Sequence, residues 1–261
     1  MRFGVLGPLE LWNAEGRLVR VPEVKVRTLL AALLVHHGEV VPAGRLIDDL
    51  WGESGYTVRP ASSLQAKVSQ LRRALDGAEP GARSLVAHQP PGYSLEVPAD
   101  ALDSGRFRDL VTRARQAGNP AEKAALLTEG LALWRGTAFA DFADQPFART
   151  AAAALEEERL VAVEEYAEAR LELGEHSALV GELTVWIERF PLREGLRAVH
   201  MRALYRAGRP SEALDSYTDL RRRLDEELGL RPGPVLDALQ QAVLRHDPAL
   251  AARAHAEGPA R

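Results

Sequence analysis

RPASSLQAKVSQLRRAL, residues 59–75, is the stretch of sequence that decides the fold. It holds four cations and no acidic residue, although the whole chain carries 33 Lys+Arg against 37 Asp+Glu. At about 100° per residue, four apolar side chains fall on one side of a helix, namely Leu64, Val68, Leu71 and Leu75. The opposite side is small, polar and cationic. The spacing therefore predicts a helix that buries one side and presents a surface without negative charge.

A helix with such a surface fits the major groove of DNA. Short side chains let it approach the base edges, and Gln, Lys and Arg can pair with adenine and guanine. The residues expected to face DNA are Arg59, Ser62, Ser63, Gln65, Ala66, Lys67, Ser69, Gln70, Arg72 and Arg73. Arg59 and the Arg72-Arg73 pair lie toward the two ends of the helix, where they are expected to hold phosphates. The alternative is a cationic surface helix that is merely solvated.

The neighbouring elements favour DNA reading, because their order is that of a winged helix-turn-helix, in which the third helix enters the groove. Alternation predicts three strands, and helical spacing then predicts two helices, over residues 2–7, 8–13, 16–21, 22–37 and 43–52. After the cationic helix, residues 84–97 read as a β-hairpin with a Pro-Gly turn. The whole of residues 1–97 is therefore expected to form this module.

Two further groups of residues are candidates for contact with DNA. In the hairpin, His88, Gln89 and Tyr93 form the wing and can reach the minor groove or its phosphates; packing of Tyr93 against the core is the alternative for that residue. At the start of the first helix, Lys25, Arg27 and Thr28 are candidates for contact with the DNA backbone, and plain surface charge is their alternative.

From residue 98 onward the pattern is helical throughout. Seven helices are expected, over residues 101–117, 120–134, 147–173, 177–189, 193–207, 211–228 and 235–245. Gly174 and Gly208 stand at equivalent turns 34 residues apart, which is the period of tetratricopeptide helical hairpins. The predicted fold is thus mainly α: an α+β winged helix-turn-helix at 1–97, an all-α tetratricopeptide-like domain at 98–247, and a flexible tail at 248–261.

Composition and motifs exclude several classes of protein. With no cysteine there is no disulfide or thiolate metal site, which suits a cytoplasmic protein. His36 and His37 are adjacent and lack a partner ligand four residues away, so no metal site is expected. The chain has no phosphate-binding loop and no hydrolase or dinucleotide-binding motif, so neither enzymatic activity nor a cofactor is expected. No apolar run is long enough to span a membrane.

The order of motifs resembles a known family. GPLEL, VRTLLAALLVHHGEVV, RLIDDLWG, LQAKVSQLRRAL and PPGYSLEV are similar to an OmpR-type winged helix. ALWRGTAF, FPLRE, LYRAGR and ELGL follow in the order of the bacterial transcriptional activator domain. Together they resemble the Streptomyces antibiotic regulatory protein family, from Met1 to about Asp247.

This resemblance implies a transcriptional activator that switches on a biosynthetic gene cluster. The resemblance implies that the protein binds double-stranded DNA as side-by-side protomers, on tandem direct repeats about one helical turn apart. The resemblance also implies a homodimer on DNA at the nucleoid, and contact with RNA polymerase holoenzyme, including its sigma factor. By position, the polymerase-facing loop holds Glu53, Ser54, Gly55 and Tyr56, where relatives often carry a Pro pair. The rival interpretation is a tetratricopeptide-like scaffold whose winged helix docks protein or is degenerate.

Overall fold

The computed structural model describes residues 1–21, 23–52 and 59–251, and its chain divides into two compact units. The first unit holds Met1–Thr112 and Glu129–Leu160, and the second holds Arg113–Thr128 and Val161–Arg261. The fold is mainly α, as predicted. The first unit includes residues on both sides of residue 97.

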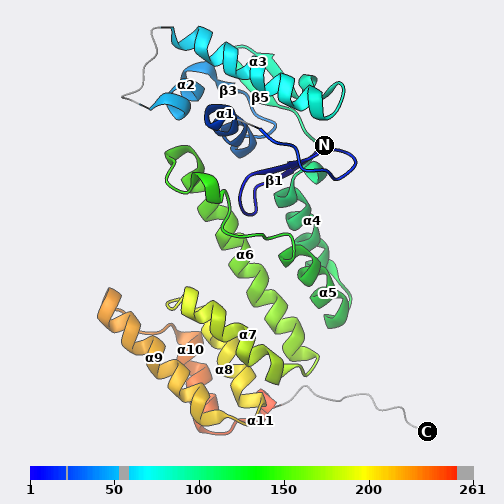
Figure 1. Ribbon diagram of the computed structural model, residues 1–261. Helices are drawn as coiled ribbons and strands as arrows, with labels where there is room; N and C mark the ends of the chain where they lie inside the picture. The colour runs from blue at the N-terminus through cyan, green and yellow to red at the C-terminus, as the bar shows by residue number, and fades with distance from the viewer. Residues whose placement is uncertain (22, 53–58, 252–261) are drawn as a thin grey trace, which may run out of the picture. The chain divides into compact units, whose positions relative to one another are not determined.

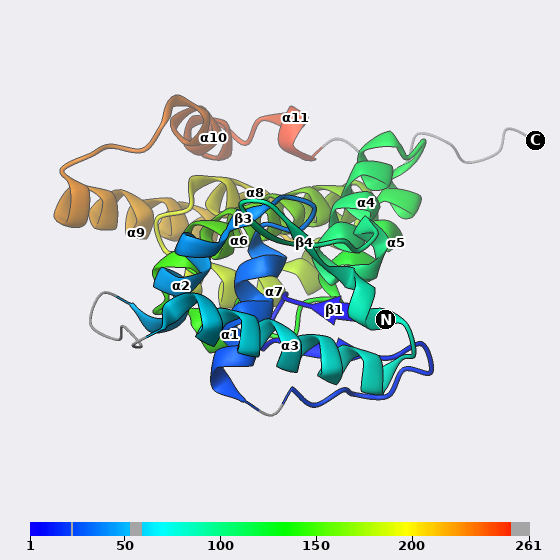
Figure 2. The same cartoon turned by 90° about the horizontal axis from the view of Figure 1, so that it is seen from above.

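Three helices and a small sheet form the winged helix-turn-helix within the first unit (Figure 1). The helices are α1 (Val24–Val35), α2 (Ala43–Trp51) and α3 (Pro60–Ala78), followed by the short helix η1 (Ala82–Leu85). The sheet has the order β3-β5-β4, from β3 (Val41–Pro42), β4 (Val86–Gln89) and β5 (Gly92–Leu95). Figure 2 shows α3 crossing α1. Eight of the twelve residues of α1 are buried.

Two strands precede this module, not the three that alternation predicts. β1 (Arg2–Gly4) and β2 (Glu10–Trp12) pair antiparallel. Of the third predicted strand, only Leu18 forms an isolated bridge, to Trp12, and the nitrogen of Val19 donates to the oxygen of Leu11 at 2.8 Å. Residues 16–21 thus bridge to β2 at one position and form no strand of their own. The strand that completes the second sheet comes instead from Val41–Pro42.

The N-terminal strands are hydrogen-bonded to residues far along the chain. The buried carboxylate of Asp103 accepts from the backbone nitrogens of Val5 and Leu6, at 2.8 and 3.0 Å, and from Nη2 of Arg135 at 2.9 Å. Nη1 of Arg135 also pairs with Oε2 of Glu10 at 2.7 Å. These bonds join residues 1–12 to the region after residue 97, so both belong to one compact unit.

A loop after Arg135 forms further hydrogen bonds to the N-terminal residues. Phe139 and Ala140 donate their backbone nitrogens to the oxygens of Val5 and Gly7, at 2.8 and 3.1 Å. Nearby is the short helix η3 (Ala140–Phe142). Three helices run from one unit into the other, namely α4 (Asp103–Gln116), α5 (Pro120–Leu131) and α6 (Pro146–Glu172), and η2 (Ala99–Ala101) precedes them.

The second unit consists of helical hairpins. Its remaining helices are α7 (His176–Arg189), α8 (Glu194–Arg206), α9 (Pro210–Leu228), α10 (Pro234–Leu244) and α11 (Pro248–Ala251). Gly174 and Gly208 do occupy equivalent turns. Both have a left-handed backbone, with φ of 82° and 76°, and the residue after each donates to a carbonyl five positions earlier. Such a turn favours glycine and ends a helix. The first four residues of the predicted tail form α11; residues 252–261 lie outside the described part.

Candidate nucleic-acid interface

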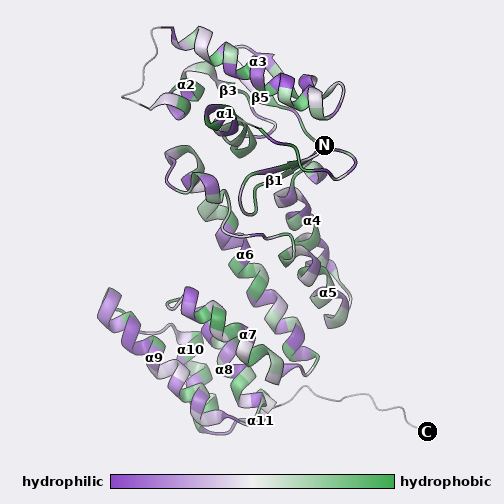
Figure 3. Ribbon diagram, viewed as in Figure 1, coloured by the Kyte–Doolittle hydropathy of each residue, from purple (hydrophilic) through white to green (hydrophobic). Residues whose placement is uncertain are grey.

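Helix α3 buries the predicted stripe and exposes the predicted surface. Leu64, Val68, Leu71 and Leu75 are its buried residues, each at most 1% exposed. In Figure 3, hydrophobic and hydrophilic stretches alternate along α3, as expected for a helix with one buried side. Its exposed polar surface, called here the reading face, consists of Arg59, Ser62, Gln65, Ala66, Ser69 and Arg73. No acidic residue belongs to it, so nothing on this face repels phosphate.

The flanks of α3 are only half-exposed, and two of their cations have protein partners. Nζ of Lys67 pairs with Oε1 of Glu23 at 2.6 Å. Arg72 donates Nε and Nη2 to the carbonyl oxygen of Val86, at 3.0 and 2.7 Å. Arg72 therefore holds the first residue of β4 against α3. Ser63 and Gln70 are half-exposed as well.

The wing follows α3 and is placed by close backbone approach. His88 pairs with Tyr93 and Gln89 with Gly92 across the β4–β5 hairpin. A Cβ at Gly92 would lie 1.8 Å from the oxygen of Val41, so only glycine lets β5 meet β3. Tyr93 is 7% exposed and contacts the His88 ring edge-on at 5.1 Å, so Tyr93 packs into the core. His88 and Gln89 are exposed, and Nε2 of Gln89 donates to Oε1 of Glu96 at 2.5 Å.

The three candidates at the start of α1 are occupied inside the protein. Nζ of Lys25 donates to the carbonyl oxygen of Leu50, at the end of α2. Arg27 pairs through Nη2 with Asp141 at 2.5 Å. Thr28 is buried, and its hydroxyl donates to the oxygen of Val24 at 2.9 Å. Each of these side chains thus has a partner within the protein, and the proposed interface does not rely on them.

Sequence reasoning missed a cation beside the reading face. Arg20 and Arg73, together with Gln70, line a cavity of about 430 Å³ between α3 and the segment before α1. Arg20 is exposed. The sequence pattern predicts a strand over residues 16–21, but the structure has none there. The signal that was available is the stretch from Gly16 to Val21, which holds two arginines and no acidic residue. Arg20 thus adds a cation beside the reading face, in a cavity that Glu23 also lines.

Ion pairs also occupy arginines on α9. Arg222 pairs with Asp219 and Glu226, and Arg223 pairs with Asp219. The candidate polymerase-facing loop, Glu53 to Tyr56, lies outside the described residues.

Within residues 1–21, 23–52 and 59–251, no cluster of three or more His, Cys, Asp or Glu could hold a metal ion. No helix in those same ranges is long and apolar enough to cross a membrane.

Two family models match the chain in the order that the fold indicates. Residues 22–95 match the model of a transcriptional regulatory protein, C terminal, and residues 102–244 match the bacterial transcriptional activator domain. The chain belongs to the Streptomyces antibiotic regulatory protein family of transcriptional activators. Members of this family are transcriptional regulators rather than enzymes.

Individual relatives of this family cover nearly the whole chain. The Regulatory protein DnrI of Streptomyces peucetius is 36% identical over 96% of this chain and 94% of its own length. The Regulatory protein AfsR of Streptomyces coelicolor is 41% identical over 96% of this chain, but the match spans 25% of AfsR. The structure of Mycobacterium tuberculosis EmbR in complex with a low affinity phosphopeptide superposes with a TM-score of 0.89, at 33% identity, over 96% of this chain and 68% of EmbR.

Proposed function

We propose that this chain is a sequence-specific DNA-binding activator whose reading face enters the major groove. The observation that carries the proposal is that face itself: an exposed helix surface of small, amide and cationic side chains without a carboxylate. Gln65 and Ser69 stand one turn apart on it, where they can donate to or accept from base edges. Arg73 and Arg59 lie at its two ends and Arg20 lies beside it, where each can bind a phosphate.

The wing and the helix act together in this proposal. The Arg72–Val86 bonds fix the start of β4 relative to α3, so His88 and Gln89 are held at a set distance from the reading face. With the helix in the major groove, these two exposed side chains contact the adjacent minor groove or its phosphates. Lys67 contributes less to phosphate binding than a free lysine would, since Glu23 compensates its charge.

Family membership supports the remaining parts of the proposal. Protomers of this chain bind side by side, as a homodimer, on tandem direct repeats in promoters at the cytoplasmic nucleoid. The loop Glu53–Tyr56 faces RNA polymerase holoenzyme and its sigma factor. Residues 98–247 organise the protomers through tetratricopeptide-like hairpins, and the target is a secondary-metabolite gene cluster.

The proposal is tested by capturing genomic fragments with the purified chain at physiological salt. The wild-type protein is expected to enrich a few promoters that share spaced direct repeats, and Arg73→Ala is expected to lose them. Arg222→Ala is the matched control, because that arginine pairs on the surface of α9 with Asp219 and Glu226. Diffuse binding by a folded wild-type protein would overturn the proposal in favour of a scaffold that binds protein.

A further inference from the structure

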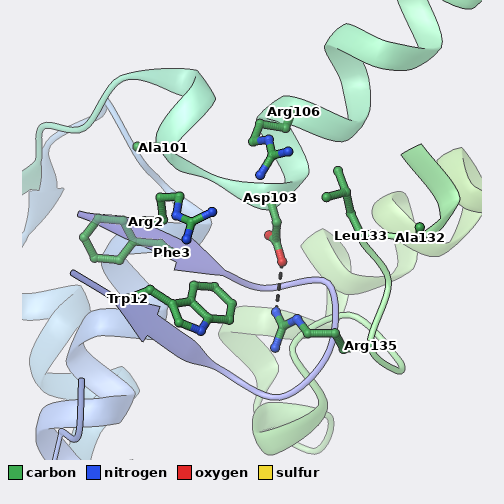
Figure 4. A pocket seen from close by; sticks show the side chains of 9 residues that line it. All are labelled: Arg2, Phe3, Trp12, Ala101, Asp103, Arg106, Ala132, Leu133 and Arg135. Atoms are coloured by element: carbon green, nitrogen blue, oxygen red, sulfur yellow. Dashed lines mark hydrogen bonds and ion pairs between the residues drawn. The ribbon is translucent and has the colours of Figure 1, made fainter. Parts of the chain in front are cut away.

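A cavity of about 200 Å³ lies in the first unit, away from the reading face, where the N-terminal sheet meets the start of α4 (Figure 4). Its walls are cationic and apolar, and are formed by Arg2, Phe3, Trp12, Ala101, Asp103, Arg106, Ala132, Leu133 and Arg135. Figure 4 shows the guanidinium ends of Arg2 and Arg106 turned toward the space beside Asp103. Three arginines thus surround one carboxylate.

Only one of the three arginines is neutralised by that carboxylate. The carboxylate oxygens of Asp103 accept hydrogen bonds from Arg135 and from the backbone nitrogens of Val5 and Leu6. Glu10 also pairs with Arg135. Among the residues that the structure describes, neither Arg2 nor Arg106 has a hydrogen bond or ion pair from its side chain. Arg2 is exposed and Arg106 is half-exposed, and both line the cavity without a protein counter-charge among the described residues, which favours an anion there.

The backbone of β1 and α4 brings these two arginines to the same cavity. Arg2 stands directly opposite Trp12 in the β1–β2 ladder, so both side chains project from the same side of the sheet. A bridge from Phe3 to Leu102 lays the start of α4 along β1. Arg106 follows Asp103 by three residues and hence lies on the same side of α4. The arginines come from different elements and converge because the sheet and the helix are joined.

The floor of the cavity suits a flat apolar group. The guanidinium of Arg135 lies 5.1 Å from the centre of the Trp12 ring, which fixes that ring in place. A Cβ at Gly4 would lie 2.7 Å from the Trp12 ring and 2.2 Å from Arg135, so glycine leaves the room that both side chains occupy. Leu133 and Ala132 supply the opposite apolar wall.

From these observations we infer that the cavity binds a small organic anion, with its phosphoryl or carboxylate oxygens on Arg2 and Arg106 and a planar apolar group against Trp12 and Leu133. A guanidinium presents paired N–H donors that match either oxyanion, and such charge-assisted bonds are stronger than neutral ones. The site is separate from the DNA-reading residues, so it provides this activator with a place for a small-molecule signal.

The test is isothermal titration calorimetry on the full chain with phenyl phosphate, benzoate, inorganic phosphate and phenol, at matched ionic strength. We expect one saturable site for phenyl phosphate or benzoate, the tighter of the two identifying the anionic group. Inorganic phosphate and phenol, which each lack one half of the ligand, are expected to bind at least about tenfold more weakly. Equal binding of inorganic phosphate would overturn the apolar half of the assignment.

Variants locate the site. Arg2→Gln and Arg106→Gln are each expected to weaken binding about tenfold or more, whereas Arg83→Gln, an exposed arginine on η1, should leave binding unchanged. Thermal unfolding of each free variant near the wild-type temperature shows that it folds. Binding that survives both changes but is lost in Arg73→Gln would place the anion on the reading face, and the absence of any saturable site would also overturn the inference.

Discussion

Arg72 donates two hydrogen bonds to the carbonyl oxygen of Val86, while its neighbour Arg73 remains on the exposed side of the same helix. Adjacent residues on a helix point about 100° apart, so the two arginines serve different purposes. Arg72 joins α3 to the wing, whereas Arg73 is exposed and donates Nε only to the carbonyl oxygen of Ser69 in its own helix, at 3.4 Å. The proposed function therefore assigns stability to the first of two neighbouring arginines and DNA affinity to the second.

The first prediction concerns Arg72. Replacing it with Ala removes two charge-assisted bonds from the oxygen of Val86, so Arg72→Ala should lower the free energy of unfolding by about 1–2 kcal/mol. Urea denaturation at neutral pH measures this change. Arg73→Ala is the control and should stay within about 0.5 kcal/mol of wild type, as surface changes do. A larger loss for Arg73→Ala than for Arg72→Ala would contradict the assignment.

The second prediction concerns DNA affinity and its dependence on salt. Each phosphate contact contributes about 0.9 to the slope of log affinity against log salt concentration. Arg73→Ala should therefore weaken binding and make the slope shallower by about 0.9. Fluorescence anisotropy with a promoter fragment over a series of salt concentrations gives both quantities. Arg222→Ala should reproduce the wild-type slope, and an equal change in both variants would mean that the DNA face lies elsewhere.

A third prediction addresses the joint at Asp103. Asp103→Ala leaves Arg135 without its buried partner and two backbone nitrogens without an acceptor, so it should destabilise the protein by about 3 kcal/mol. Asp103→Asn keeps one carbonyl oxygen and should lose less. Hydrogen exchange reports the effect locally, with faster exchange expected at the amides of Val5 and Leu6. Asp100→Ala, at an exposed position on η2, should leave that exchange unchanged.

The fourth prediction is a pH dependence from His200. Burial, with the charges of Arg197 and Arg209, lowers the pKa of His200 to about 4, from 6.5. Between these values the unfolded chain binds a proton that the folded chain does not, so stability falls as the pH drops. At about pH 5 the loss from this group should be about 2 kcal/mol relative to about pH 7.5.

The measurement is urea denaturation of wild type and His200→Gln at those two pH values. The variant should lose about 2 kcal/mol less than wild type on acidification. The same dependence in both proteins would show that His200 titrates normally in the folded state.

Periodicity predicted the helices well because burial of one side leaves a regular trace in the sequence. All four residues assigned to the buried stripe of α3 are buried. The helix predicted over residues 211–228 is observed as Pro210–Leu228. In each case the information is local, since the same few residues that form the helix also carry its apolar side.

Contacts between distant residues were not predictable in this way. Periodicity places Lys67 and Arg72 on the flanks of α3, but not the Glu23 and Val86 that engage them. The alternation of apolar and polar residues in 16–21 is equally compatible with a strand and with an exposed segment. The segment forms a single bridge to β2 and is therefore not a strand. Arg20 was overlooked for the same reason, because its place beside Arg73 depends on how that segment folds back.

The bonds from Asp103 and Arg135 to the N-terminal strands also bear on the exchange of parts between relatives. A chimera spliced after residue 97 would unite strands from one parent with hydrogen-bond partners from another, across an interface that was never matched. A cassette confined to residues 22–95 leaves β1, β2 and those partners together in the recipient. An exchange of the winged helix-turn-helix between relatives is therefore best made as that inner cassette, with the first strands left in the protein that already supports them.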